Sequence, residues 1–259
     1  MTITPNPLLD LTGKIALING GSRGIGLSIA KAFAANGAHV IIASRKQEAC
    51  NQAVAAIVAA GGSAQAHACH IGDTAQIEAL FAAIGEQHGR LDILVNNAAA
   101  NPYQGPIVET SLSVYEKTMD VNVRGYFFSC VHGTRLMALH GAGGSIINVA
   151  SVNGIMPGMG QGIYSVSKAA VLSMTLAFAQ ECIGSGIRVN ALVPGPTETR
   201  FAAPVLQDPE AMQALLPRLP MGRLGQPDEM AGAALYLASS ASSYTNGASI
   251  TVDGGFLLA

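Results

Sequence analysis

Residues 14–36 read KIALINGGSRGIGLSIAKAFAAN. The apolar run Lys14–Asn19 predicts a buried strand, and the spacing of apolar residues over Gly24–Asn36 predicts a helix. Between them, Gly20, Gly24 and Gly26 form a glycine-rich turn. Such a turn lets the backbone approach a pyrophosphate closely, and the start of the helix offers it free N–H groups. We therefore expect a first strand–turn–helix unit that binds a dinucleotide.

The order strand, helix, strand recurs to the end of the chain. Further strands are expected at His39–Ala43, Ala64–Cys69, Leu91–Val95, Ser145–Val149, Ile187–Val193 and Ser249–Val252. Further helices are expected at Gln47–Ala60, Thr74–Gln87, Leu112–Leu139, Gln161–Ile183 and Pro227–Ser239. Nearly all-apolar strands indicate a parallel sheet covered on both faces, and right-handed crossovers make it doubly wound. No Pro/Ser/Gly-rich linker divides the chain, so we predict one α/β domain over residues 1–259. It is a doubly wound Rossmann fold with a parallel seven-stranded sheet and helices on both faces.

Composition excludes several classes of function. The 259 residues carry a net charge of −2 without a basic stripe, which argues against nucleic-acid binding. No uninterrupted apolar run reaches the roughly 18 residues of a membrane span, and Met1–Asp10 lacks the features of a secretory signal. Only 12% of the residues are charged and 49% are hydrophobic, which favours extra surface buried between subunits.

The cysteines and histidines do not suggest a metal site. The four cysteines form no C-x-x-C pair, as expected for reduced thiols in a cytosolic protein. His67 and His70 flank Cys69, but the expected strand would point the two histidines to different faces. No second group has zinc spacing, so we expect no metal.

The end of the second strand indicates which nucleotide binds. NAD-binding proteins commonly carry an acidic residue there for the ribose 2′-hydroxyl, whereas this chain has Ser44-Arg45-Lys46. Arg45 could form a fork with a 2′-phosphate, and Arg23 in the glycine turn could add a second charge. We therefore predict NADP(H).

Tyr164, Lys168 and Ser151 form the candidate catalytic group. A free tyrosine has a pKa near 10, and lowering it by about 3 units takes roughly 4 kcal/mol of preferential phenolate stabilisation. A cation at i+4, as Lys168 is, can supply part of that. Ser151 follows the expected strand Ser145–Val149, at the edge where doubly wound sheets bind ligands. Asn122 could instead be an ordinary buried amide, and Asn97 an ordinary turn residue at the end of a strand.

Together these motifs resemble the short-chain dehydrogenase/reductase family over nearly the whole chain. The resemblance rests on Gly20–Gly26, Asn96-Asn97-Ala98, Asn122, Ser151, Tyr164 with Lys168, Pro194-Gly195 and Val252-Asp253-Gly254-Gly255. Within the family, three segments are similar to the NADPH-dependent peroxisomal-type carbonyl (retinal) reductases. These segments are Ala43–Gln47, Cys69–Gly72 and Asn97–Pro102.

The resemblance implies a role for each matching residue. Tyr164 would be the acid/base, Lys168 would lower its pKa and hold the nicotinamide ribose, and Ser151 would bind the substrate oxygen. Asn122 would support a water in the proton relay. The cofactor would be lined by Gly20, Ser22, Arg23, Ile25, Arg45, Ile71, Asn97, Tyr164, Lys168, Pro194, Thr197 and Thr199. Members of the family are typically homotetramers.

The chain departs from the family pattern at three positions. Asn19 stands where threonine is usual, and Ala99 replaces a glycine. His70 stands where an aspartate often contacts adenine, so that contact is in doubt. The ending Phe256–Ala259 lacks a peroxisomal tripeptide, which favours a cytoplasmic location.

These features predict reversible reduction of a small-molecule ketone or aldehyde by NADPH. Ser151, Asn153 and Tyr103 are expected to bind the substrate, beneath a covering segment at about 196–222 that is rich in Ala, Leu, Pro and Met. That segment could instead pack against another subunit. Two other functions stay open: a 3-oxoacyl-thioester reductase and a non-catalytic NADP(H)-binding regulator, a class that typically lacks the tyrosine or lysine.

Overall fold

The sheet has the predicted architecture. A computed structural model describes residues 7–259; residues 1–6, and with them part of the predicted domain and of the segment searched for a secretory signal, lie outside the described residues. Seven parallel strands pair in the order β3-β2-β1-β4-β5-β6-β7. They are β1 Ile15–Asn19, β2 His39–Ser44, β3 Ser63–Ala68, β4 Ile93–Asn96, β5 Gly144–Val149, β6 Ile187–Pro194 and β7 Ser249–Val252. The predicted doubly wound, parallel, seven-stranded sheet is confirmed.

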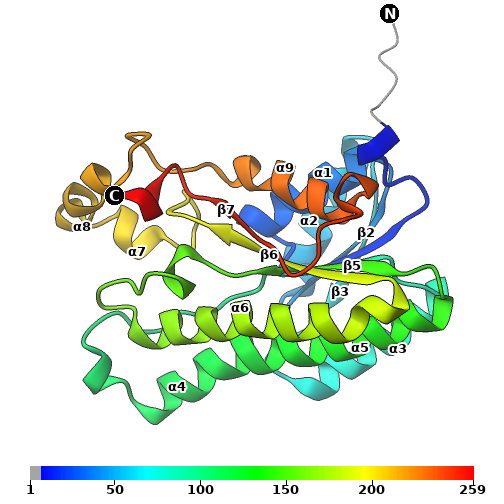
Figure 1. Cartoon of the computed structure of the whole chain (residues 1–259), viewed down its shortest axis with the longest axis horizontal. Helices are drawn as coiled ribbons and strands as arrows, with labels where there is room; N and C mark the ends of the chain where they lie inside the picture. The colour runs from blue at the N-terminus through cyan, green and yellow to red at the C-terminus, as the bar shows by residue number, and fades with distance from the viewer. Residues whose placement is uncertain (1–6) are drawn as a thin grey trace, which may run out of the picture.

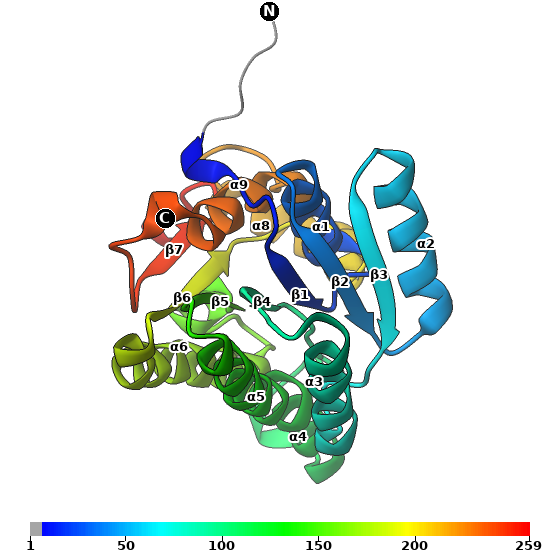
Figure 2. The same ribbon diagram turned by 90° about the vertical axis from the view of Figure 1, so that its right-hand side faces the viewer.

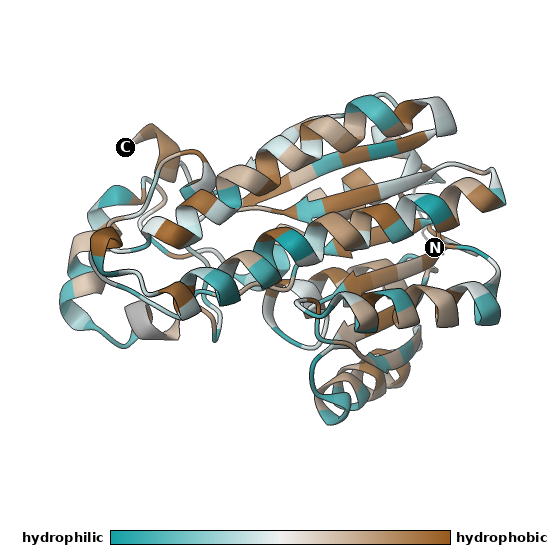
Figure 3. Ribbon diagram, turned by 90° about the horizontal axis from the view of Figure 1, so that it is seen from below, coloured by the Kyte–Doolittle hydropathy of each residue, from teal (hydrophilic) through white to brown (hydrophobic). Residues whose placement is uncertain are grey.

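Helices cover both faces of this sheet (Figures 1 and 2). The helices are α1 Gly24–Ala35, α2 Gln47–Ala59, α3 Thr74–His88, α4 Leu112–Met119, α5 Gly125–His140, α6 Gly162–Cys182, α7 Ala203–Leu206, α8 Pro209–Leu215 and α9 Pro227–Ala238. One core lies between the sheet and α1, α2 and α9, and the other between the sheet and α3, α5 and α6. The strands between these layers are mostly hydrophobic, while the helices alternate along their length (Figure 3).

The strand order reverses direction between β1 and β4, which pair with each other. Such a switch point leaves a crevice at the carboxyl ends of the strands, where open α/β sheets bind ligands. The short helices α7 and α8 lie beyond the same ends (Figure 1). The fold therefore brings the glycine turn, the residues after β4 and β5, and the predicted covering segment to one edge.

One predicted helix is interrupted. Instead of a single helix over Leu112–Leu139, α4 and α5 are separated by a π-helical turn, Asp120–Arg124. A π turn inserts one extra residue and rotates everything after it around the helix axis. Asn122 lies within the π turn and Tyr126 just after it, and both are fully buried.

Helix α6 is the one helix within residues 7–259 that is long and apolar enough, by length and composition, to cross a membrane. An 18-residue window within its apolar stretch, 162–185, has a mean hydropathy of 1.3, and 44% of that window is buried inside the protein. It packs on β6 and buries Lys168 and Thr175. These properties are those of a core helix.

Candidate active site

The glycine turn has the geometry of a phosphate cradle. Gly20 adopts φ 76°, and a Cβ added there would lie 2.7 Å from the backbone of Ala98, so no larger residue fits. Asn97 Nδ2 donates to the Gly20 carbonyl at 3.0 Å and fixes the turn. Helix α1 begins at Gly24 without a side-chain cap from Arg23, which leaves its first N–H groups available to an anion. The residues present therefore fit a dinucleotide pyrophosphate.

Two arginines near the glycine turn could pair with further negative charge on a dinucleotide. Arg45 lies directly after β2 and Arg23 precedes α1; both are exposed, and neither forms an ion pair with any residue of 7–259. An unpaired guanidinium at the end of the second strand suits a 2′-phosphate. Ser22 and Ile25 lie in and after the turn, both partly buried, and Ile71 is buried beyond the end of β3.

The segment after β6 lies over this cradle. Pro194 ends β6, and Thr197 is buried, with its hydroxyl donating to the Gly195 carbonyl at 2.9 Å. The Thr199 methyl group lies 3.5 Å from where a Gly24 Cβ would be. The predicted cofactor residues on both sides of the crevice thus come together.

The predicted catalytic side chains also converge. Tyr164 and Lys168 lie one turn apart in α6, 7% and 1% exposed, and the Lys168 ammonium is 5.7 Å from the centre of the Tyr164 ring. Lys168 Nζ donates to the Val149 carbonyl of β5 at 2.7 Å. Ser151, two residues further on, hydrogen-bonds the Tyr164 phenol and accepts the Asn153 N–H at 3.1 Å. A hydroxyl, a phenol and an ammonium therefore share one buried site.

Burial controls the protonation of this group. Burial raises the pKa of Tyr164 to about 12, although the hydrogen bond from Ser151 acts to lower it. Burial also lowers the pKa of Lys168 to about 7. Desolvation disfavours whichever form is charged. The phenol is therefore protonated at neutral pH in this arrangement. The expectation that Lys168 lowers the phenol's pKa stays a prediction.

Asn122 anchors the neighbouring loop. Its Oδ1 accepts the Ala100 N–H at 2.8 Å, and its Nδ2 donates to the Ala100 carbonyl at 2.9 Å and to Ser167 Oγ at 3.0 Å. Protein partners thus take both donor positions of the side-chain amide and one acceptor position of its oxygen. Its support of a water in a proton relay stays a prediction.

The two remaining substrate-binding candidates are held by local contacts. Asn153 Nδ2 donates to Gln161 Oε1 at 2.7 Å. The Tyr103 hydroxyl donates to the Pro106 carbonyl at 3.2 Å and lies 3.3 Å from Glu109 Oε2. Both side chains stabilise the loops beside the site, and their contact with a substrate stays a prediction.

The sequence interpretation missed a ladder of buried amides beneath the site. Asn19 Nδ2 donates to Asn96 Oδ1 at 3.0 Å, Asn96 Nδ2 to Asn148 Oδ1 at 2.9 Å, and Asn148 Nδ2 to Thr175 Oγ1 at 3.0 Å. The three asparagines pair in register across β1, β4 and β5. Their signal in the sequence is an asparagine at or near the end of each of three apolar strands. The ladder fixes the register of the strands that carry the site.

Phe201 lies within the covering segment predicted at about 196–222, but it was not singled out there. Its ring lies 5.7 Å from the ring of Tyr164, centre to centre, although it comes from the segment after β6. Nothing in the sequence apart from its aromatic character marked it. The predicted covering segment therefore lies near the glycine turn at Thr199 and beside the Tyr164 ring at Phe201.

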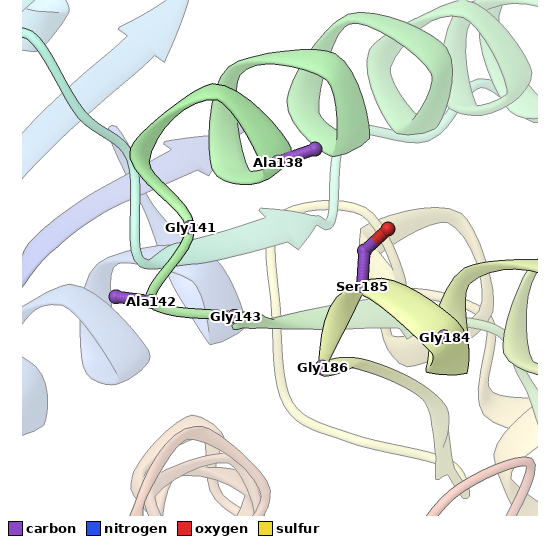
Figure 4. A pocket seen from close by; sticks show the side chains of 7 residues that line it. All are labelled: Ala138, Gly141, Ala142, Gly143, Gly184, Ser185 and Gly186. Atoms are coloured by element: carbon purple, nitrogen blue, oxygen red, sulfur yellow. The ribbon is translucent and has the colours of Figure 1, made fainter.

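Other candidate sites do not compete with this one. Residues 7–259 contain no cluster of three or more His, Cys, Asp or Glu side chains able to hold a metal, and all four cysteines are buried and free. A hollow between the α5–β5 turn and the end of α6 is lined by glycines, alanines and Ser185 (Figure 4). It has no titratable lining side chain and lies at the opposite ends of the strands. We assign no chemistry to it.

Comparison with known proteins agrees with the geometry. The family model described as enoyl-(acyl carrier protein) reductase matches residues 20–257. Dehydrogenase/reductase SDR family member 4 of Oryctolagus cuniculus is 38% identical over 245 residues, covering 95% of this chain and 94% of the relative. The rhamnolipids biosynthesis 3-oxoacyl-(acyl-carrier-protein) reductase of Pseudomonas aeruginosa is 38% identical over 259 residues, covering 98% of this chain and all of the relative.

A solved structure gives the same result. The gluconate 5-dehydrogenase of Burkholderia cenocepacia, in complex with NADP and tartrate, is 33% identical and superposes with a TM-score of 0.93. The match covers 98% of each chain. The glycine cradle, the Ser/Tyr/Lys group and these full-length similarities lead to one conclusion: the chain belongs to the short-chain dehydrogenase/reductase family.

Proposed function

We propose that the protein is an oxidoreductase that reduces a ketone or aldehyde to an alcohol with NADPH, reversibly. The observation that carries this function is the convergence of Ser151, Tyr164 and Lys168 beside the glycine cradle. The choice of NADP(H) is supported by the unpaired Arg45 and Arg23, and by the NADP bound to the Burkholderia cenocepacia relative.

The chain's own groups can bind the carbonyl and protonate it. When bound, reduced nicotinamide supplies a hydride to the carbonyl carbon. Ser151 and Tyr164 would hold the carbonyl oxygen and stabilise the charge that develops on it. Tyr164 would then donate its proton to that oxygen, and the protonated phenol found at neutral pH is the form that reduction requires. Lys168, fixed on the Val149 carbonyl, would keep a positive charge beside the phenol.

The segment at about 196–222 would cover the substrate. Its contacts with Gly24 and Tyr164 support that role. Phe201 presents an aromatic face beside the phenol, and Leu219 is buried while Met221 is exposed. These apolar side chains favour a carbonyl with an apolar or bulky substituent over a polyhydroxylated one.

A second candidate is reduction of a 3-oxoacyl thioester. It is favoured by the Pseudomonas aeruginosa relative, whose printed name gives that activity and which matches along its whole length. The rate of reduction is measured for a 3-oxoacyl thioester and for simple ketones of equal chain length at the same NADPH concentration. This comparison distinguishes the two candidate functions. The non-catalytic regulator is disfavoured because the serine, tyrosine and lysine are all present and close together.

The assembly and location are further proposals. A homotetramer is supported by aromatic side chains left exposed on α5, Phe127 and Phe128, together with the low charged fraction of the chain. The cytoplasmic location expected from the sequence stays a prediction.

The decisive experiment replaces the proposed acid. Tyr164→Phe keeps the ring and its packing but removes the proton, so carbonyl reduction should fall by about 10²–10⁴-fold. NADPH binding, measured by nucleotide fluorescence, should stay within a few-fold of wild type. Activity near wild type in a variant that binds NADPH normally would remove Tyr164 from this role.

A further inference from the structure

A second buried tyrosine, Tyr126, lies directly against the candidate catalytic lysine. It is the second residue of α5 and is fully buried, as is Asn122 one turn before it. Its ring centre is 5.2 Å from Lys168 Nζ. Its hydroxyl donates to the Val149 carbonyl at 3.3 Å, the same oxygen that accepts from Lys168 at 2.7 Å. The function proposed above gives this side chain no role.

The hydrogen bond of the Tyr126 hydroxyl to the Val149 carbonyl orients its ring beside the lysine. A phenylalanine would fill the same space, whereas a buried hydroxyl costs free energy unless it finds a hydrogen-bond partner. The only partner the Tyr126 hydroxyl has among residues 7–259 is the carbonyl already used by the ammonium. The hydroxyl and the ring are thus both directed at the position of Lys168.

Lys168 needs such a neighbour. The ammonium is 1% exposed, and no carboxylate within residues 7–259 pairs with it. The titratable groups that face it are Tyr164 on its own helix and Tyr126 on α5, with Cys130 one turn further along α5. Burial raises the pKa of all three, so at neutral pH none offers a negative charge. What remains to favour the protonated lysine is the Val149 carbonyl and the aromatic faces.

We propose that Tyr126 is a positioning residue for Lys168: its ring holds the ammonium on the Val149 carbonyl and extends the pH range over which the lysine stays protonated. A cation within about 6 Å of a ring centre is attracted to the negative face of the ring, and the attraction is largest where water is excluded. Both conditions are met here. The importance of this charge for the reaction rests on the proposed function, whereas the contact itself does not.

The experiment measures the proton on Lys168 directly, in the protein without added nucleotide. Lysine labelled with ¹³C at Cε gives one signal for each of the five lysines, and the signal missing from Lys168→Met identifies the buried one. Wild type is compared with Tyr126→Phe, Tyr126→Met and a protein with pentafluorophenylalanine at position 126. Phenylalanine keeps the negative ring face, methionine removes the ring, and the fluorinated ring keeps the shape but removes the negative face. Tyr244→Phe, at a fully exposed tyrosine, is the control.

We expect the titration midpoint of the Lys168 signal in Tyr126→Phe to stay within about half a pH unit of the wild-type value. It should fall by about one unit in Tyr126→Met and in the fluorinated protein, as the loss of a desolvated cation–π contact implies. In assays of carbonyl reduction, the alkaline limb of the kcat profile should move in the same direction.

Equal midpoints in the phenylalanine and pentafluorophenylalanine proteins would overturn the proposal, and that pair has the same shape even if Tyr126→Met does not fold. A shift of the lysine signal without any carbonyl reduction by wild type would instead contradict the proposed function and leave the Tyr126–Lys168 contact established.

Discussion

At the scale of single residues, Tyr164 and Lys168 are displaced from their ordinary pKa values in opposite directions, to about 12 and about 7. Reduction of a carbonyl uses the protonated phenol, whereas oxidation of an alcohol uses the phenolate. Raising the pH increases the fraction of phenolate, so alcohol oxidation should rise by up to about tenfold per unit between pH 7 and pH 10. Reduction should stay level or fall over the same range, because Lys168 loses its proton above about pH 7.

Initial rates in both directions, measured from pH 6 to pH 10 at constant ionic strength, test this prediction. Tyr164→Phe is the control, because the residual rate of alcohol oxidation by this variant should not rise with pH. Parallel profiles for the two directions would contradict the assignment of the phenol as the titrating group.

Arg45 gives the second prediction at this scale. It is exposed and without an ion-pair partner among the described residues, so its guanidinium is free to pair with a 2′-phosphate. Arg45→Ala should weaken NADPH binding by about 10–100-fold, the value of a charge-assisted hydrogen bond, and change NADH binding little. Calorimetric titration with both nucleotides measures the ratio. Arg135→Ala, an exposed arginine on α5, should leave it unchanged, and an unchanged ratio in Arg45→Ala would exclude the phosphate fork.

Residue types in the sequence were enough to single out Ser151, Tyr164 and Lys168 as candidates, and the fold brings the three side chains together. They were not enough for Asn148. An asparagine inside an apolar strand has no partner in the one-dimensional sequence, and its place in the ladder depends on the pairing of β4 with β5. Phe201 lay within the predicted covering segment, but its contact with Tyr164 could not be predicted for the same reason, since it joins segments that only the fold brings together.

At the scale of elements, the strands and most helices could be predicted because each has one dominant periodicity. The π-helical turn Asp120–Arg124 could not. Local propensity favours an uninterrupted helix there, whereas Asn122 in the turn hydrogen-bonds Ala100 and Tyr126 after it packs against Lys168. Tertiary hydrogen bonds thus outweigh the local preference, as they often do near functional sites.

The segment after β6 provides the prediction at this scale. It places Thr199 near Gly24 and Phe201 near Tyr164. Phe201→Ala should lower kcat/KM for bulky apolar ketones by roughly tenfold, since an aromatic contact and its buried area are lost, and affect a small aldehyde less. Phe201→Tyr, which keeps the ring, is the matched variant. A uniform loss for all substrates would mean that Phe201 supports the fold of the segment and does not contact the substrate.

At the scale of the whole molecule, the seven-stranded sheet followed from the sequence because nearly all-apolar strands separated by helices have few alternatives to a parallel sheet covered on both faces. The order β3-β2-β1-β4-β5-β6-β7 places its switch point beside the glycine turn, and so joins cofactor chemistry to residues more than a hundred positions away. Contacts between subunits are harder to predict from one sequence, because an interface residue and an ordinary exposed apolar residue look alike in sequence.

The surface of α5 offers a test of the assembly. Phe127 and Phe128 are 45% and 37% exposed, and their rings stack edge to face at 5.7 Å. Phe127 also lies 5.3 Å from Phe178 of α6, so the aromatic surface spans two helices. Apolar patches of this kind commonly mark an interface. If subunits meet there, a carboxylate in place of one of these rings would be desolvated in the interface, which costs several kcal/mol.

Native mass spectrometry of the wild type should therefore show a tetramer, and Phe128→Glu should shift it to smaller species. Tyr244→Glu, at a fully exposed position, is the control and should leave the assembly intact. A wild-type monomer would contradict the proposed assembly outright. A tetramer that survives Phe128→Glu would place its interfaces on other surfaces, and the exposed phenylalanines of α5 would then need a different partner.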